Sequence, residues 1–141
     1  MKQSRLYATS VAIGGRAVLL MGPSGSGKSD LALRLIDRGA DLVSDDYTVL
    51  EARDGTLFAT APDTIAGKIE VRGIGIIEMP RVHDIAVALV VCLDGVVERM
   101  PLRPKAITVA GVDLPEITLN AFEESAAIKV ELALHRATKG L

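Results

Sequence analysis

The pattern of apolar and polar positions in the first third of the chain predicts two strands followed by a helix. Residues 6–13 and 17–21 are strand-like, and the pair Gly14-Gly15 between them predicts a two-residue hairpin turn. After a glycine-rich loop, helical spacing predicts a helix over 28–38 that Gly39 ends. Its predicted buried face consists of Leu31, Ala32, Leu35 and Ile36.

The middle of the chain is predicted to be mostly β-structure. Residues 47–52 and 57–61 form two expected strands around the turn Arg53-Asp54-Gly55. The segment 69–79 is rich in β-branched residues but is interrupted by two glycines. The apolar run 85–93 predicts a strand that is covered on both faces.

The last third is predicted to be loop-like over 101–115, with a hairpin around Ala110-Gly111, before a final helix. Asn120 is expected to cap that helix, with Glu123 completing a capping box. The expected apolar stripe consists of Phe122, Ala126, Val130, Ala133 and Ala137. The whole pattern predicts one α/β domain over 1–141, with too few helices for a regularly alternating βαβ sheet.

Composition narrows the classes of function. About half of the 141 residues are hydrophobic, and the net charge is −2 without a basic run, so nucleic-acid binding has no support. Aromatic residues are scarce, at two Phe, two Tyr and no Trp, so the core must be aliphatic. The single cysteine, Cys92, excludes a disulfide within the chain and is expected to be buried. We expect a cytoplasmic location, with no signal peptide and no membrane span.

The strongest motif is Gly22-Pro23-Ser24-Gly25-Ser26-Gly27-Lys28-Ser29, which matches the P-loop pattern. It follows an apolar strand and opens a helix, as nucleotide binding requires. Its glycines let consecutive backbone N–H groups point at phosphate oxygens. Lys28 is expected to reach the β- and γ-phosphates, and the Ser29 hydroxyl to ligate Mg²⁺. The motif therefore predicts a site for ATP and Mg²⁺.

Two acidic positions compete for the role of the metal-side carboxylate. Asp94 follows the apolar run, but Asp94-Gly95 is also a common turn sequence. The adjacent Asp45 and Asp46 would repel each other unless a cation neutralised them, as a Mg²⁺–nucleotide complex would. Both positions remain candidates at this point.

A second unusual segment covers residues 69–77, in which Glu70 and Arg72 alternate with β-branched residues. Gly73 and Gly75 stand two apart, which suggests a close approach of the backbone to a partner. An edge strand with a Glu–Arg surface pair fits the spacing equally well.

Taken together, the motifs at 22–29, 38–46 and 69–77 resemble the catalytic domain of HPr kinase/phosphorylase, mainly over residues 5–100. With no separate N-terminal domain in the sequence, the resemblance is to a short form. It implies a P-loop kinase fold related to phosphoenolpyruvate carboxykinase, with a mixed β-sheet around a central P-loop helix. It also implies serine phosphorylation of the phosphocarrier HPr, phosphorolysis of phosphoserine by inorganic phosphate, and a hexamer.

The resemblance implies roles for individual residues. Lys28 binds phosphate, and Ser29, Asp45 and Glu70 serve the metal. Asp46 is the base in the kinase direction and the acid in the reverse direction, because a serine hydroxyl needs a nearby carboxylate to take its proton. Arg72 lies in the span 69–78, which belongs to both reactions.

Two positions depart from the family pattern. Tyr7 stands where the family has a histidine upstream of the P-loop, and a phenol does not exchange protons at neutral pH as an imidazole does. The family's late arginine is missing from 119–125, and Arg103 is the residue that could replace it. His83 and His135 match no family position and are expected at the surface.

Two other functions remain open besides the HPr kinase. One is a small-molecule P-loop kinase that uses Asp94, although no arginine-rich lid is evident. The other is a non-catalytic nucleotide sensor that acts through partner binding. A GTPase is disfavoured because the sequence has no Asn-Lys-x-Asp motif to recognise the base.

Overall fold

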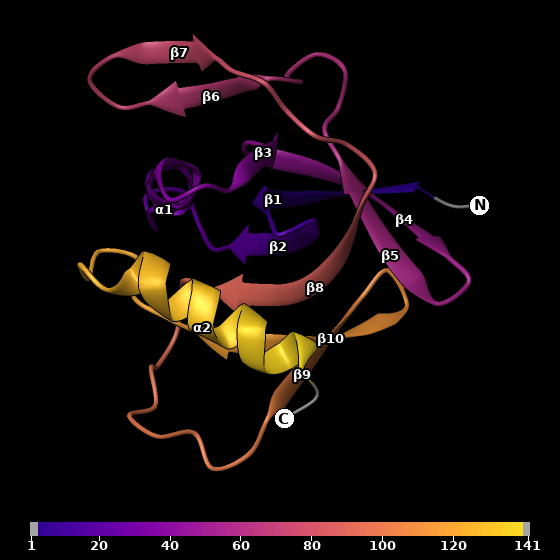
Figure 1. Cartoon of the computed structure of the whole chain (residues 1–141), viewed down its shortest axis with the longest axis vertical. Coiled ribbons are helices and arrows are strands. Elements are labelled where there is room, and N and C mark those ends of the chain that lie inside the picture. The colour runs from indigo at the N-terminus through magenta and orange to yellow at the C-terminus, as the bar shows by residue number, and fades with distance from the viewer. Residues whose placement is uncertain (1–2, 140–141) are drawn as a thin grey trace.

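The computed structural model describes residues 3–139, and within that range ten strands and two helices form the molecule (Figure 1). The predicted α/β class is confirmed. In chain order the elements are β1 (Gln3–Ile13), β2 (Arg16–Met21), α1 (Lys28–Asp37), β3 (Asp41–Ser44), β4 (Tyr47–Arg53), β5 (Thr56–Thr60), β6 (Lys68–Val71), β7 (Gly75–Glu78), β8 (Ile85–Cys92), β9 (Lys105–Val109), β10 (Val112–Thr118) and α2 (Ala126–Thr138).

Eight strands form one mixed sheet, and β6 and β7 form a separate hairpin. The main path is β2-β1-β4-β5-β8-β10-β9, with β3 beside β1, and a further pairing of β2 with β8 closes the path on itself. The β2–β8 and β8–β10 pairs are parallel, while the other pairs are antiparallel. Strand β1 pairs with β4 up to Tyr7 and with β2 from Ala8 onward, so Tyr7 lies where β1 changes partner.

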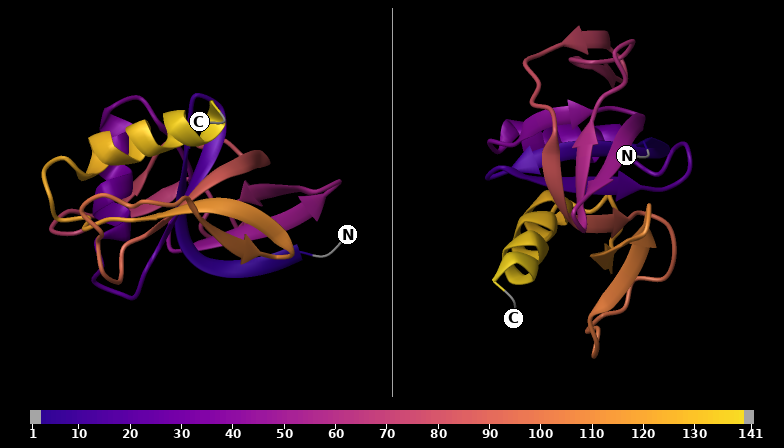
Figure 2. Two further views of the ribbon diagram at one scale, coloured as in Figure 1. Left: turned by 90° about the horizontal axis from the view of Figure 1, so that it is seen from below. Right: turned by 90° about the vertical axis from the view of Figure 1, so that its right-hand side faces the viewer.

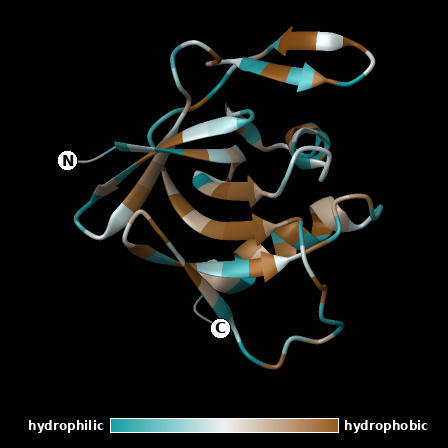
Figure 3. Ribbon diagram, turned by 180° about the vertical axis from the view of Figure 1, so that it is seen from behind, coloured by the Kyte–Doolittle hydropathy of each residue, from teal (hydrophilic) through white to brown (hydrophobic). Residues whose placement is uncertain are grey.

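The P-loop lies at the end of the most buried part of this sheet. Because β2 and β8 run parallel, both end at the same edge, where the Leu93 backbone N–H donates to the Met21 carbonyl at 2.8 Å. Figure 3 shows apolar residues concentrated in the central strands, whereas the β6–β7 hairpin mixes apolar and polar residues. The loop that follows β2 is thereby attached to a rigid support.

The two helices pack against the strands and against each other (Figure 2). The predicted buried face of α1 is confirmed, since Leu31, Ala32 and Leu35 are fully buried and Ile36 packs against the same cluster. Arg38 at the end of α1 bonds Glu131 of α2 at 2.8 Å, and this hydrogen bond with its charge attraction raises the pKa of Arg38.

The expectations for the last third of the chain are partly wrong. Helix α2 begins at Ala126 after Ser125, so Asn120 and Glu123 do not form its capping box. The Asn120 side chain instead accepts a hydrogen bond from the Phe122 backbone N–H at 2.9 Å, an Asx turn that competes with helix initiation. Phe122 therefore lies outside the helix and is 70% exposed.

The stretch predicted as loop contains strands β9 and β10, although the hairpin at Ala110-Gly111 is confirmed. Strand β10 forms because it pairs with both β9 and β8, a long-range contact that local residue preference does not reveal. Cys92 is half-buried at the end of β8 rather than buried, and its thiol donates to the Asp94 carbonyl. Among the described residues, the helices are too short and too polar to cross a bilayer.

Candidate functional site

The glycines of the P-loop are required by its conformation and by its neighbours. Gly25 and Gly27 have φ angles of 85° and 94°, in the left-handed region that side chains disfavour. A Cβ atom on Gly27 would lie 2.9 Å from the Cβ of Ala121, closer than real contacts allow. The Gly27 carbonyl accepts the first helical hydrogen bond from Leu31 at 2.9 Å, so the loop leads directly into α1.

Lys28 is 5% exposed and is held inside the loop. Its Nζ donates to the carbonyls of Gly22 at 2.6 Å and Pro23 at 3.1 Å. The same ammonium lies 4.1 Å from the centroid of the Tyr7 ring, a cation–π contact. Tyr47 packs beside Tyr7 with ring centroids 5.3 Å apart. The Tyr7 ring thus covers the P-loop lysine.

Asp45 is a buried junction between three segments of the chain. Its Oδ1 accepts hydrogen bonds from the hydroxyls of Thr9 at 3.1 Å and Ser29 at 2.6 Å. Its Oδ2 accepts from the backbone N–H of Glu70 at 3.0 Å. One carboxylate therefore joins strand β1, the start of α1 and the β6–β7 hairpin.

The neighbouring Asp46 has the opposite environment. Its backbone N–H donates to the Thr9 hydroxyl at 3.1 Å, and its φ of 71° places it in the left-handed region, where Asp is tolerated better than most residues. Its carboxylate is exposed and lines the cavity above the P-loop. Strain of this kind at a cavity wall is characteristic of functional sites.

A cavity of about 860 Å³ brings most of the predicted site residues together. Its lining includes residues of the P-loop, Tyr7, Phe122 and the hairpin residues from Glu70 to Gly75. Lys28, Ser29 and Asp46 all face this space. The volume is within the range of small-ligand pockets.

Other sequence candidates lie elsewhere. Asp94 is in an exposed bend after β8, next to the end of the P-loop strand, and it is absent from the described residues that line the cavity. Arg103 is exposed in the segment between β8 and β9 and does not line it either. His83 and His135 are exposed, as expected. The arginine that does line the cavity is Arg72.

Sequence reasoning missed Thr9 and misplaced Phe122. Thr9 is fully buried and bonds both acidic residues, and the only available signal was a hydroxyl inside an apolar strand. Phe122 had been assigned to a helix stripe because its spacing fits one. Its exposure beside the P-loop depends on contacts from distant segments.

The site suits a magnesium–nucleotide complex in two respects. Mg²⁺ in phosphate-transfer sites uses few protein ligands and takes others from the phosphates, so Ser29 with Asp45 or Glu70 fits that chemistry. The Ser26 hydroxyl is also buried without a partner among the described residues, inside a loop whose shape suits anions.

The proteins that the chain matches are described as HPr kinases. The model of the HPr Serine kinase C-terminal domain matches residues 1–137. The HPr kinase/phosphorylase of Clostridium botulinum (strain Eklund 17B / Type B) is 40% identical over 87 residues, which cover 62% of this chain and 29% of the relative. That of Clostridium tetani is 38% identical over 95 residues, 67% of this chain and 31% of the relative. The chain thus matches under a third of the length of these curated relatives.

A solved structure matches nearly the whole chain. The Hpr(Ser) kinase/phosphatase from Coxiella burnetii superposes with a TM-score of 0.81 at 29% identity, covering 98% of this chain and 99% of that chain. The expected mixed-sheet fold of the HPr kinase type is thereby confirmed. On the family match and this structural likeness, the chain belongs to the HPr Serine kinase C-terminal domain family.

Proposed function

We propose that this chain is an ATP- and Mg²⁺-dependent serine kinase that phosphorylates an HPr-like phosphocarrier protein. The observation that carries the proposal is the exposed Asp46 carboxylate in the same cavity as Lys28 and Ser29. A P-loop by itself only holds phosphates, whereas a carboxylate beside it can serve a hydroxyl acceptor. The kinase/phosphorylase names of the relatives support the same substrate class.

In the forward direction, the acceptor serine oxygen forms a bond to the γ-phosphorus while the bond from that phosphorus to the β,γ-bridging oxygen breaks. Asp46 takes the serine proton, and ADP leaves. The P-loop N–H groups and Lys28 stabilise negative charge on the phosphate oxygens. Ser29 with Asp45 or Glu70 would hold Mg²⁺, which would supply further charge neutralisation. Arg72 lines the same cavity, which supports a contact with the acceptor or the transferred group.

The reverse reaction would use the same carboxylate in its protonated form. An oxygen of inorganic phosphate attacks the phosphoserine phosphorus, the serine–phosphate bond breaks, Asp46 returns a proton to serine, and pyrophosphate forms. Tyr7 stands at the position where the family has a histidine, so we expect phosphorolysis to be weaker than phosphorylation. The family resemblance also suggests assembly into a homo-hexamer, which sedimentation velocity can measure.

The proposal is tested by incubating the protein with Mg²⁺, γ-labelled ATP and an HPr-type protein, and then mapping phosphoserine. Labelled serine in HPr supports the kinase, and added phosphate then tests the reverse reaction. Transfer to a small hydroxyl compound instead would favour a small-molecule kinase. Binding without any transfer would favour a nucleotide sensor.

A further inference from the structure

One of the four aromatic side chains in the sequence is kept at the surface beside the P-loop. Phe122 is 70% exposed, more than Tyr7 at 36% or Tyr47 at 41%, which also reach the surface. A single exposed apolar residue is ordinary by itself. The unusual feature here is how firmly its segment, residues 119–125, is held.

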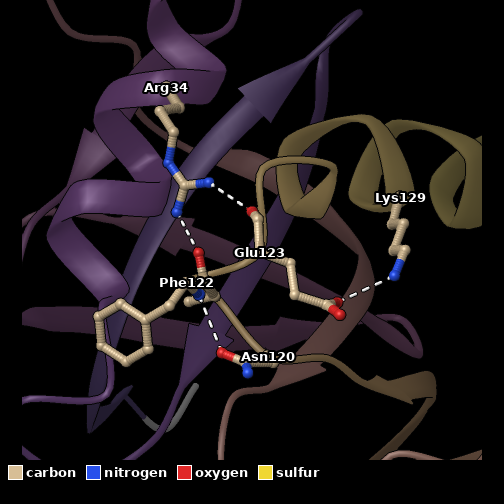
Figure 4. Close-up of polar contacts among 6 residues, drawn as sticks. Arg34, Asn120, Phe122, Glu123 and Lys129 are labelled. Atoms are coloured by element: carbon tan, nitrogen blue, oxygen red, sulfur yellow. Dashed lines mark hydrogen bonds and ion pairs between the residues drawn. The ribbon is translucent and has the colours of Figure 1, made fainter.

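Figure 4 shows the contacts that fix this segment. The Arg34 guanidinium of α1 donates to the carbonyls of Ala121 and, at 3.1 Å, Glu123. The Glu123 side chain accepts from Lys129 of α2 at 2.9 Å, and Asn120 closes the turn at Phe122. Contacts from both helices therefore position the ring, so its exposure is built into the fold.

The ring lies against the P-loop. Two of its atoms would be 3.4 Å from a Cβ on Gly27, and Phe122 lines the same cavity as Lys28. Figures 1 and 2 place the β6–β7 hairpin and the segment before α2 on opposite sides of α1. The hairpin that carries Glu70 and Arg72 and the segment that carries Phe122 thus lie on different sides of α1.

We infer that Phe122 forms the nucleoside subsite of this pocket, where its ring stacks against the base or ribose of the nucleotide. The inference rests on the proposed nucleotide-binding function. The γ-phosphate must face Asp46 and the hairpin, so the nucleoside leaves the P-loop on the other side, where Phe122 lies. Stacking on an aromatic ring accepts any base, because every base has a π-face.

The test is calorimetric titration of wild type, Phe122→Ala and Phe122→Tyr with Mg²⁺-ATP and with Mg²⁺-tripolyphosphate, which has no nucleoside. We expect Phe122→Ala to weaken ATP binding about tenfold and to leave tripolyphosphate binding unchanged, while Phe122→Tyr keeps both affinities. Leu102→Ala is the control, since Leu102 is 91% exposed and outside the residues lining the cavity.

Each of the following results would overturn the inference. Unchanged ATP affinity in Phe122→Ala would show that the ring does not contact the nucleoside. An equal loss for ATP and tripolyphosphate would show that the ring only shapes the loop. A higher KM for the phosphocarrier with unchanged ATP affinity would assign the ring to the acceptor protein. If wild type bound neither ATP nor tripolyphosphate, the proposed nucleotide-binding function would itself be wrong. This result differs from the others, in which wild type binds both compounds and only the role of Phe122 is wrong.

Discussion

The cavity above the P-loop has an inner side and an outer side that are built differently. On the inner side, Thr9, Lys28 and Asp45 are buried. The Thr9 hydroxyl donates to Asp45, and Lys28 donates to a carbonyl of the P-loop. On the outer side, Asp46 and Arg72 are exposed and face open space. The comparison suggests that inner residues hold phosphate and fix the geometry of the site, whereas outer residues meet the acceptor. Inner substitutions should therefore change phosphate binding, loop shape or stability, and outer ones the phosphoryl-transfer step.

The two adjacent aspartates show this difference most directly. Asp45 accepts three hydrogen bonds from protein groups, and Asp46 offers its carboxylate to the cavity. Although the two residues are adjacent in the sequence, one carboxylate is buried and the other is exposed. We propose that Asp45 combines the metal role that the resemblance implies with a second role, which is to position Ser29 and the hairpin.

The largest effect is expected for Lys28→Ala on the inner side. The substitution removes the Lys28 ammonium, which lies inside the P-loop and donates to its carbonyls. The negative charge of a bound phosphate would then have no cation from the loop to neutralise it. Calorimetry should detect neither ATP nor tripolyphosphate binding. Arg16→Ala, at an exposed position beside the first hairpin turn, should bind both like wild type. Wild-type affinity in Lys28→Ala would contradict the P-loop assignment.

The next largest effect is expected for Asp46→Asn on the outer side, which should slow phosphoryl transfer. Asp46→Asn removes the proton acceptor, and general-base catalysis typically contributes about 10²- to 10⁴-fold, so phosphoryl transfer to HPr should fall by that factor. ATP affinity and urea-unfolding free energy should stay close to wild type, because the side chain is exposed. Full kinase activity in this variant would rule out the proposed role of Asp46.

The matched change at Asp45 should behave differently. Asp45→Asn turns a charged acceptor of three hydrogen bonds into an amide whose NH₂ group faces a donor, which should cost about 2 kcal/mol of unfolding free energy. Urea unfolding of both asparagine variants measures the contrast. If Asp45→Asn lost Mg²⁺-dependent binding with unchanged stability, Asp45 would be a metal ligand without the positioning role.

The smallest effect is expected at Tyr7. Its ring lies 4.1 Å from the Lys28 ammonium, and partly exposed cation–π contacts contribute about 0.5–1 kcal/mol. Tyr7→Ala should therefore weaken ATP binding about two- to fivefold, while Tyr7→Phe retains it. Tyr47→Ala is the control. Tyr47 packs against Tyr7, whereas the cation–π contact with Lys28 is made by the Tyr7 ring. Equal losses in both alanine variants would indicate a general loosening of this corner.

Tyr7→His offers a related test of reaction direction. Restoring the family's imidazole should increase phosphorolysis of phosphoserine-HPr relative to phosphorylation, because imidazole exchanges protons near neutral pH. The ratio of the two rates, measured on the same preparation, is the relevant quantity. An unchanged ratio would show that this position does not set the direction.

Local patterns in the sequence were sufficient for much of the fold and for the phosphate loop. The hairpin turn at Gly14-Gly15, helix α1 and its end at Gly39 depend on neighbouring residues, whose backbone preferences and spacing are readable in one dimension. The P-loop is likewise a continuous segment. The order and spacing of its glycines, lysine and serine are enough to predict phosphate binding.

Only the tertiary structure decided how the two aspartates differ and where Phe122 points. Thr9 and Asp45 are 36 residues apart, Asp45 and Glu70 are 25 apart, and Arg34 and Ala121 are 87 apart. Burial and hydrogen bonding across such separations depend on which strands pair, and local residue preferences do not encode that. The sequence therefore determined the phosphate-binding loop, and the packing of distant segments around it determined which side chains face the cavity.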